Sequence, residues 1–359
     1  MKPLRRALAG LALAAACTDQ APLPTDPSLA AGTTPAATPV TVMTQNMYVG
    51  ADLDAVIRAL LGGGDPIPAL VQAVNTLLAN DLDTRVAAMA DNIARQRPQV
   101  VALQEVSGIV LELPSPPFPS PISVSQDFTV QLLAALAARG LEYEVAAANL
   151  NFTIDLTPLV GVPIRLTDQE VLLVDRRVEV LASSHAVFSC PPLCIPLSFG
   201  TIRRGWVRLD ARIAGRAMTF VGTHLESGSD PLTSALRAAQ AQVLAGMFSG
   251  VANPVVLMGD LNDVPGSPMD AAFQQAGFTD LWTAAGSGPG NTCCHHPDLR
   301  AGDLHKRIDY VMVRGGFRNG AGEIIGGARI GVIDPLLSAG GPLWPSDHGG
   351  LAAHLPPAK

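Results

Sequence analysis

The chain has 359 residues, of which 48% are hydrophobic and 15% are charged, and its formal net charge is −7. This apolar content excludes a wholly disordered chain, and the length predicts one large domain or two average ones. A net negative charge is not typical of a nucleic-acid-binding protein, although it does not exclude a local basic groove. Aromatic residues make up only 4% of the chain, so the core must consist mainly of aliphatic side chains.

The N-terminal segment has the pattern of an export signal. Residues 1–6 are basic, and residues 7–16 form an apolar run that is too short to span a bilayer as a helix. We therefore predict that residues 1–17 are a signal peptide. Small residues precede Cys17, as they do in bacterial lipoproteins, so we expect this cysteine to carry a lipid and attach the protein to a membrane. Plain secretion is the alternative.

Residues 18–40 are rich in Pro, Ala and Thr, a composition that predicts a flexible linker. Later segments contain no run of about 18 apolar residues, the length that a membrane-spanning helix requires. The protein is therefore expected to be extracellular, periplasmic or anchored by lipid at the cell envelope. Loss of residues 1–17 removes three basic and no acidic residues and brings the formal charge from −7 to −10.

Four cysteines follow the predicted signal peptide, and an even number in an exported chain favours disulfides over metal ligation. These cysteines are Cys190, Cys194, Cys293 and Cys294. The first two could close a small loop, but the spacing does not decide the connectivity. Two histidines follow Cys294 directly, and four adjacent residues do not readily wrap one ion, because closed zinc sites space their ligand pairs.

Strands and helices alternate from residue 41 onward. The first predicted strands are residues 41–46 and 100–103, and the first predicted helices are residues 83–96 and 126–139. Asp83 is expected to cap the first of these helices. Residues 112–123 contain five prolines and are expected to form an irregular surface loop.

The middle of the chain is rich in predicted strands. They are residues 142–148, 170–174, 178–181, 205–213 and 217–223, and residues 214–216 between the last two have the composition of a hairpin turn. Further on we predict helices 233–248 and 267–276 and strands 254–258 and 307–313. Hairpins mixed with strand–helix alternation predict packed sheets flanked by helices, in one α/β domain over residues 41–359.

Polar residues recur where predicted strands end. They are Asn46, Glu105, His224, Asp260 and Asn262, with Asp309 near the start of a strand and Asp347-His348 before the last apolar run. A single carboxylate at such a place is often a turn former or a helix cap. Asp309 is harder to explain in this way, because strands disfavour Asp and a buried Asp needs a partner.

Together these side chains predict metal-assisted chemistry on a phosphate. Hard cations such as Mg²⁺ prefer oxygen ligands, chiefly carboxylates, with coordination positions left for water and phosphate. Two imidazoles can transfer protons or stabilise charge on phosphoryl oxygens. The chain contains neither the Gly-x-Ser-x-Gly elbow of serine hydrolases nor the phosphate-binding loop of nucleotide hydrolases.

Six motifs in this order resemble the endonuclease/exonuclease/phosphatase superfamily, which includes DNase I-like nucleases, neutral sphingomyelinases and inositol-polyphosphate 5-phosphatases. They are Gln45-Asn46-Met47, Leu103-Gln104-Glu105-Val106, Gly222-Thr223-His224-Leu225, Gly259-Asp260-Leu261-Asn262, Arg307-Ile308-Asp309-Tyr310-Val311 and Ser346-Asp347-His348. The resemblance implies a four-layer α/β/β/α sandwich with mixed and antiparallel central sheets. It also implies Glu105 as the principal Mg²⁺ ligand, assisted by Asn46 and Asp347, with Mn²⁺ or Ca²⁺ as alternatives.

The resemblance assigns catalytic roles to the other residues. Asp309 would orient the imidazole of His348. Asp260 and Asn262 would position the attacking water and the phosphate, and His224 would stabilise the phosphoryl oxygens or assist the leaving group. Whether Asp260 or His348 is the general base, and whether one or two metals bind, stay open. Family members often carry a further acid, tyrosine or arginine, and the candidates Asp168, Arg176 and Arg204 receive no role.

The predicted function is that of an exported Mg²⁺-dependent phosphoester hydrolase, a phosphodiesterase of nuclease-like or sphingomyelinase-like type. A phosphomonoesterase acting on inositol phosphates is the alternative, and a non-catalytic binding protein with the same fold is the alternative of another class. A nuclease would use the basic pairs 176–177, 203–204 and 306–307, whereas a lipid enzyme would use an apolar loop tip such as Phe118. No protein partner is implied.

Overall fold

The computed structural model describes residues 39–62, 64–115, 120–197, 200–318, 320–331 and 341–358. Contacts divide the chain into two units, residues 1–36 and 37–359, and every described residue belongs to the second. The predicted signal peptide with Cys17, nearly all of the predicted linker, and Phe118 lie outside the described residues. Within the described part, no helix has the length and apolar character needed to cross a membrane.

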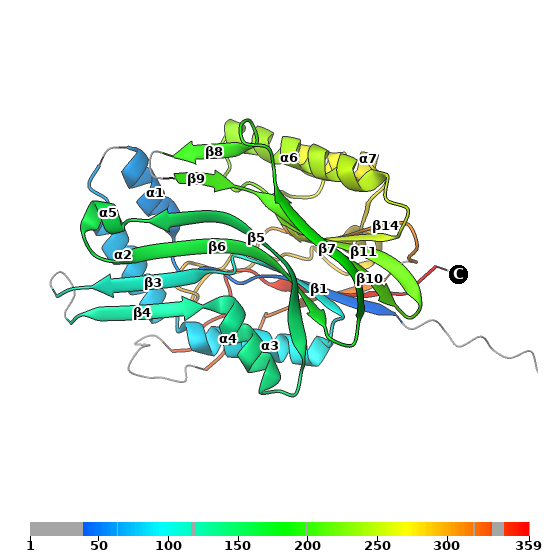
Figure 1. The fold of residues 1–359 in the computed structure, drawn as a ribbon, viewed down its shortest axis with the longest axis horizontal. Helices are drawn as coiled ribbons and strands as arrows, with labels where there is room; N and C mark the ends of the chain where they lie inside the picture. Colours follow the sequence, from blue (N-terminus) through cyan, green and yellow to red (C-terminus); the bar gives the residue numbers. More distant parts are fainter. Residues whose placement is uncertain are drawn as a thin grey trace, which may run out of the picture. The chain divides into compact units, whose positions relative to one another are not determined.

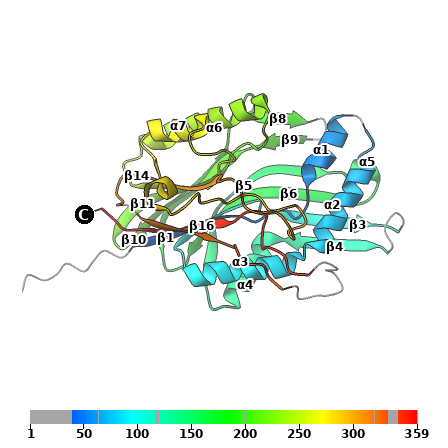
Figure 2. The same ribbon diagram turned by 180° about the vertical axis from the view of Figure 1, so that it is seen from behind.

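The first of two large sheets contains the N- and C-terminal strands of the domain. Its described strands follow the order β15-β16-β1-β2-β6-β3-β4, with β5 paired to β6, and β1 and β2 run parallel. Figure 2 shows β16 beside β1. The strands are β1 (Val40–Asn46), β2 (Val100–Gln104), β3 (Gly108–Leu113), β4 (Ile122–Asp127), β5 (Tyr143–Asp155), β6 (Ile164–Asp175), β15 (Ala321–Ile325) and β16 (Gly350–Leu355).

The second large sheet follows the order β13-β14-β12-β11-β10-β7, and β11 and β12 run parallel in it. Its strands are β7 (Glu179–Val187), β10 (Gly205–Ile213), β11 (Arg216–His224), β12 (Val255–Asp260), β13 (Thr279–Asp280) and β14 (Asp309–Arg314). A small antiparallel sheet consists of β8 (Cys194–Leu197) and β9 (Gly200–Arg203).

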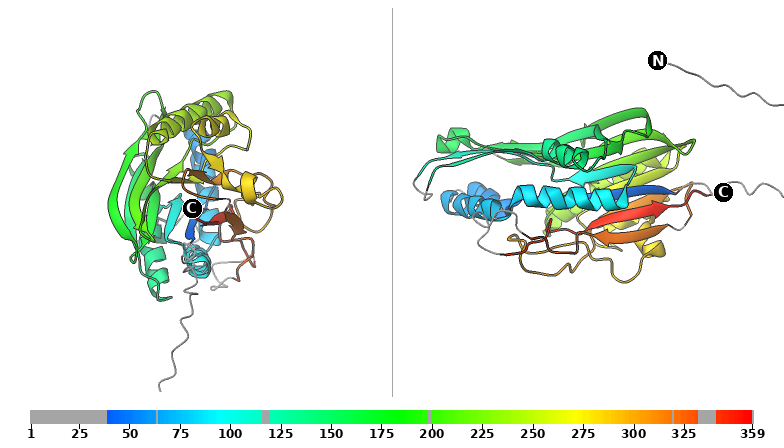
Figure 3. Two further views of the ribbon diagram at one scale, coloured as in Figure 1. Left: turned by 90° about the vertical axis from the view of Figure 1, so that its right-hand side faces the viewer. Right: turned by 90° about the horizontal axis from the view of Figure 1, so that it is seen from below.

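Helices cover the outer faces of the two large sheets (Figures 1 and 3). The main helices are α1 (Leu53–Leu61), α2 (Ile67–Ala79), α3 (Leu82–Gln96), α4 (Phe128–Ala137), α6 (Pro231–Ser249) and α7 (Pro268–Gln275); the short ones are α5 (Thr157–Val160) and α8 (Leu281–Ala285). Figure 1 shows α3 and α4 on one side of the stacked strands and α6 and α7 on the other.

The alternation of side chains along β2 explains two of the layers. Val100 and Ala102 belong to the apolar cluster between the two sheets, whereas Val101 and Leu103 belong to the cluster under helices α1 to α4. Successive side chains of a strand point to opposite faces, so a strand buried on both faces needs apolar residues at every position.

Strand β12 repeats this pattern in the second sheet. Val256 and Met258 face the first sheet, and Val255 and Leu257 pack against α6 and α7. Three apolar clusters thus separate four layers, which confirms the predicted α/β/β/α sandwich.

Several details differ from the prediction. The cap of α3 is Asp81 rather than Asp83, since the Asp81 side chain accepts a hydrogen bond from the Thr84 amide. The predicted loop at residues 112–123 is shorter than expected, because its end residues 112–113 and 122–123 pair in the hairpin of β3 and β4. The following helix begins at Phe128, two residues later than predicted.

The cysteines pair within their own short segments. One disulfide joins Cys190 to Cys194 and the other joins Cys293 to Cys294. The expectation of disulfides is thus confirmed, and these sulfurs are not free thiolates that could bind a metal.

Candidate active site

The two pairs of parallel strands bring the predicted site residues to one edge of the sandwich. Asn46 ends β1, and His224 and Asp260 end the neighbouring strands β11 and β12, where they face each other in register. Asp309 begins β14 and is the register partner of Asp260. Glu105 follows β2, the parallel neighbour of β1. Residues from both sheets therefore meet where the parallel strands end.

Asn46 connects the two sheets through its amide group. Its Nδ2 donates hydrogen bonds to Glu105 Oε1 at 3.0 Å and to Asp260 Oδ2 at 3.1 Å. Its Oδ1 accepts a hydrogen bond from the Tyr48 amide at 2.8 Å. Asn46 thus fixes the positions of two carboxylates, and direct metal ligation by Asn46 stays a prediction.

Asp309, His348 and Asp260 form a row of alternating carboxylates and imidazole. His348 Nδ1 donates to Asp309 Oδ2 at 2.8 Å, and its Nε2 lies 3.8 Å from Asp260 Oδ2. Burial alone would lower the pKa of His348, but the surrounding carboxylates, Asp309 first, raise it well above its ordinary value. Burial and the charge of Asp309 raise the pKa of Asp260 to about 7.

His224 approaches Asp260 from the other side and has the opposite electrostatic character. Its Nε2 lies 3.6 Å from Asp260 Oδ2. Burial, together with the charges of Arg204 and His348, lowers the pKa of His224 well below its ordinary value. The site therefore holds one neutral and one cationic imidazole around a single carboxylate.

Two polar residues of the site have left-handed backbone conformations. Asn262 has φ 54°, donates its amide to Asp260 Oδ1 at 2.9 Å, and donates Nδ2 to the Leu225 carbonyl at 3.0 Å. Glu105 has φ 53°, which costs more for Glu than for Asn. Residues in such conformations cluster at functional sites, where the surrounding structure holds them.

A cavity of about 360 Å³ opens beside these residues, and Glu105, His224, Asn262 and Asp347 belong to its wall. Burial raises the pKa of Asp347 to about 6, and the charge of Glu105 adds to this effect. The structure thus brings all eight predicted residues together, with Asp260 and Asp309 buried behind the wall.

The cavity wall also contains residues to which the sequence assigned no role. Asp168 and Arg204 are both buried there, and Glu226 lies 3.4 Å from the Arg204 guanidinium. Glu170 is buried next to them and accepts a hydrogen bond from the His224 amide at 2.9 Å. The third candidate, Arg176, instead forms an ion pair with an acid on the surface.

A divalent cation fits the donors on the cavity wall. Glu105 and Asp347 present carboxylate oxygens there, and the charge of Glu105 adds to the burial that raises the pKa of Asp168 and of Asp347. Asp260, Asp309 and His348 also place possible ligand atoms within 4.8 Å of one another. We favour Glu105 and Asp347 as ligands, because both line the cavity, whereas Asp260, Asp309 and His348 do not.

Solved structures of known proteins have a similar fold. A protein of the endonuclease/exonuclease/phosphatase family from Leptotrichia buccalis has a similar fold, with a TM-score of 0.58 and 16% identity over 88% of this chain and 99% of that one. A mannosyl-6-phosphatase from Bacteroides thetaiotaomicron has a TM-score of 0.55 and 13% identity, with 88% and 99% of the two chains covered. An endonuclease/exonuclease/phosphatase from Bacteroides vulgatus has a TM-score of 0.53 and 17% identity, over 89% of this chain and 100% of that one.

No curated protein matches the chain in sequence. The model of the endonuclease/exonuclease/phosphatase family, however, matches residues 43–348, which include all eight residues of the site. The members of this family are phosphoester hydrolases that generally use divalent metal ions. The chain therefore belongs to the endonuclease/exonuclease/phosphatase family and is a phosphoester hydrolase.

Proposed function

We propose that the protein is an exported Mg²⁺-dependent phosphodiesterase. The observation that carries the proposal is the position of Asp260, which lies between two imidazoles and shares the Asn46 amide with Glu105. This arrangement sets a buried base beside a carboxylate suited to hold a hard cation. None of the eight family positions is replaced by an inert residue, which favours an enzyme over a binding protein.

Different residues of the protein would each assist one part of the in-line attack of water on phosphorus. Glu105 and Asp347 would hold Mg²⁺, which when bound supplies Lewis-acid polarisation of a phosphoryl oxygen. Asp260 would accept the proton of the attacking water. His348, kept cationic by Asp309, would stabilise the negative charge that develops on phosphate.

His224 would interact with the leaving group of the reaction. Its low pKa keeps the imidazole neutral near pH 7, so its ring N–H would donate a hydrogen bond that stabilises negative charge on the leaving oxygen. Asn262 fixes one oxygen of Asp260 and thereby the direction from which the base approaches water.

The charge of the cavity wall favours a diester over a monoester. Its acidic residues are Asp52, Glu105, Asp168, Glu226 and Asp347, and its basic residues are Arg204 and Lys306. A phosphomonoester dianion would meet more repulsion from this wall than a diester monoanion. The mannosyl-6-phosphatase from Bacteroides thetaiotaomicron has a similar fold. For this reason the substrate panel that tests the proposal includes a phosphomonoester.

The basic pairs of the sequence give little support to a nucleic-acid strand as substrate. Arg176, Arg177, Arg204 and Arg307 each form an ion pair with an acidic side chain of the protein. Affinity for nucleic acid depends on cations that neutralise successive phosphates. We therefore favour a substrate with a single phosphodiester, such as a lipid headgroup.

A substrate panel tests the proposal directly. The purified protein would be assayed with Mg²⁺ on bis-p-nitrophenyl phosphate, sphingomyelin, plasmid DNA, RNA and an inositol phosphate. We expect cleavage of the small diester and of the lipid diester at higher kcat/KM than of the others. Faster cleavage of monoesters would establish the phosphatase alternative, and faster cleavage of DNA or RNA would establish a nuclease.

Export is a separate part of the proposal and rests on residues 1–17 and on Cys17. Fractionation of a bacterial host that produces the full chain would show where the protein resides. We expect it in the membrane fraction, and Cys17→Ser should release it. Retention of the full-length chain in the cytoplasm would contradict export.

A further inference from the structure

A second cavity, of about 70 Å³, adjoins the catalytic one and differs from it in character. Helices α1 and α2 form one side of this cavity, and strands β3, β5 and β6 form the other. Its wall is built from aliphatic side chains, among them Val56, Leu70, Ala73, Ile109 and Ile164. It is therefore an apolar cavity next to a polar, acidic one.

The two cavities share part of their walls. Val49, Ala51, Leu53 and Leu166 contact both of them. The backbone amide of Val49 donates a hydrogen bond to Glu105 Oε2 at 3.1 Å. The apolar cavity thus begins at the residue that also positions a proposed metal ligand.

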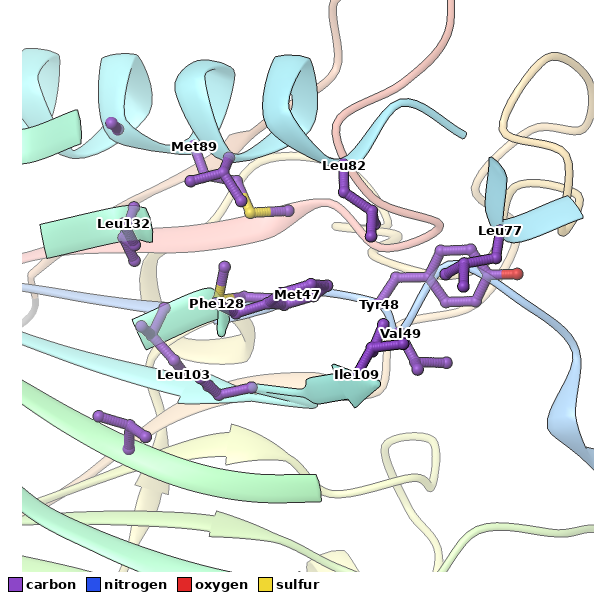
Figure 4. Close-up of a cluster of buried hydrophobic side chains, with 14 of the residues drawn as sticks. Met47, Tyr48, Val49, Leu77, Leu82, Met89, Leu103, Ile109, Phe128 and Leu132 are labelled. Carbon is purple, nitrogen blue, oxygen red and sulfur yellow. The ribbon is translucent and has the colours of Figure 1, made fainter. Parts of the chain in front are cut away.

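Arg165 is the charged residue in the wall of this cavity, and its guanidinium lies at the surface. The Arg165 guanidinium pairs with Asp155 at 2.9 Å, and 57% of the Arg165 side chain is exposed. Its aliphatic stem therefore lines the cavity while its head stays in solvent. Figure 4 shows Val49 and Ile109 together, with Leu77 of α2 close to them, and all three belong to the wall.

An apolar cavity in this position favours an apolar occupant over water. Water gains no hydrogen bonds against such a wall, and a void in a core lowers the stability of a fold. An apolar group that is covalently attached to the phosphate would fill the cavity while the phosphate stays in the catalytic one. Two cavities of opposite character that share a wall match the two ends of an amphiphile.

We propose that the cavity between α1, α2 and the first sheet binds an apolar substituent of the phosphodiester substrate. The inference rests on the proposed function, since it concerns the substrate of that same site. It specifies a diester in which one ester group carries an alkyl chain. The enzyme then selects amphiphilic diesters over fully water-soluble ones.

A series of alkyl p-nitrophenyl phosphodiesters tests the inference, with methyl, butyl, hexyl and octyl esters below the concentration at which they form micelles. Release of p-nitrophenolate reports every member in the same way. We expect kcat/KM to rise by about fourfold per methylene until the cavity is filled, and then to level off. The gain should appear mainly as a lower KM.

Ala73→Phe places a ring in the cavity and should bring kcat/KM for the octyl ester down to the value for the methyl ester. The methyl ester itself should be cleaved within about twofold of the wild-type rate. Ala134→Phe, on the exposed face of α4, is the matched control and should leave the series unchanged. If Ala73→Phe does not fold, Leu70→Ala enlarges the cavity, and the plateau should then move to longer chains.

The outcomes separate the two proposals. Equal kcat/KM for all chain lengths, with bis-p-nitrophenyl phosphate still cleaved, would overturn the apolar site and leave the phosphodiesterase proposal standing. A rise with chain length that survives unchanged in both cavity variants would also overturn the site. Failure to cleave any diester would refute the proposed function and the inference that depends on it.

Discussion

At the scale of single residues, Asp309 determines the protonation state of His348, which faces the proposed base Asp260. It is fully buried and accepts the Nδ1 proton of His348 at 2.8 Å. Its charge is the main reason that His348 stays cationic in a buried place. A neutral amide of the same shape keeps the packing and removes that charge.

Asp309→Asn should therefore lower kcat for bis-p-nitrophenyl phosphate by about 100-fold or more. The melting temperature should change little, because the substitution is isosteric. Asp303→Asn, at an exposed position, is the control and should keep full activity. Wild-type turnover in Asp309→Asn would mean that the charge on His348 is irrelevant to catalysis.

Glu170 should make the stability of the protein depend on pH, because burial raises the pKa of its carboxyl group well above the ordinary value of 4.5. The folded protein keeps this proton, while the unfolded chain loses it as the pH rises above 4.5. The free energy of unfolding should therefore fall with rising pH in this range. Glu170→Gln removes the titration, so the loss of stability between about pH 5 and about pH 8 should be smaller than in wild type. Urea unfolding in EDTA measures the free energy of unfolding at each pH. An identical pH dependence in wild type and Glu170→Gln would contradict the prediction.

Much of the site could be predicted because polar side chains stand out at the ends of apolar strands. Asp309 stood out further because strands disfavour Asp. The same argument applies to Asp168, but the predicted strand began at residue 170, whereas β6 begins at Ile164. Asp168 therefore precedes the predicted strand. Arg204 was a candidate without an assigned role, since its acidic partner Glu226 is distant in sequence.

At the scale of elements, Gly259 lets the ends of β11 and β12 approach each other. Its φ is +155°, and a Cβ there would lie 1.9 Å from the Thr223 carbonyl oxygen. Thr223 and Gly259 immediately precede His224 and Asp260 in the parallel register. This glycine therefore sets the distance between His224 and Asp260, two residues of the proposed catalytic site.

Gly259→Ala should lower the free energy of unfolding by about 2–4 kcal/mol, because the backbone must move to relieve the contact. It should also reduce kcat. Gly246→Ala in α6 meets nothing within 4 Å and is the matched control. It should raise stability by about 0.5–1 kcal/mol. Equal effects of the two substitutions would contradict the role of Gly259.

Element boundaries were harder to predict than the elements. The prolines of residues 112–123 lie between β3 and β4, so they marked the loop but not the residues at which the two strands end and begin. Asp81 and Asp83 both suit a cap, and only the local turn decides that Asp81 accepts the Thr84 amide. Strand β15 has a half-exposed pattern at a sheet edge and gave no periodic signal.

At the scale of the whole molecule, both cavities come from segments far apart in the sequence. The apolar one combines residues from Val49 to Leu166. Each contributing segment has the pattern of an ordinary core helix or strand, so no local pattern predicts the cavity. The strand and helix patterns predicted packed sheets flanked by helices, and the resemblance of the six motifs to the family supplied the four-layer arrangement.

Metal binding should stabilise the folded domain as a whole. Mg²⁺ at about 100 times its dissociation constant should add about 2.7 kcal/mol to the free energy of unfolding. Glu105→Gln should remove most of this gain, which thermal melts with and without Mg²⁺ would show. An equal Mg²⁺ effect in both proteins would exclude Glu105 as a ligand.

The most direct measurement is the rate of bis-p-nitrophenyl phosphate hydrolysis against Mg²⁺ concentration, in wild type and in Asp260→Asn. We predict a saturable dependence on Mg²⁺, no turnover in EDTA, and a kcat at least about 100-fold lower in the folded variant. Undiminished hydrolysis in EDTA, or wild-type turnover in Asp260→Asn, would contradict a metal-dependent phosphodiesterase centred on Asp260.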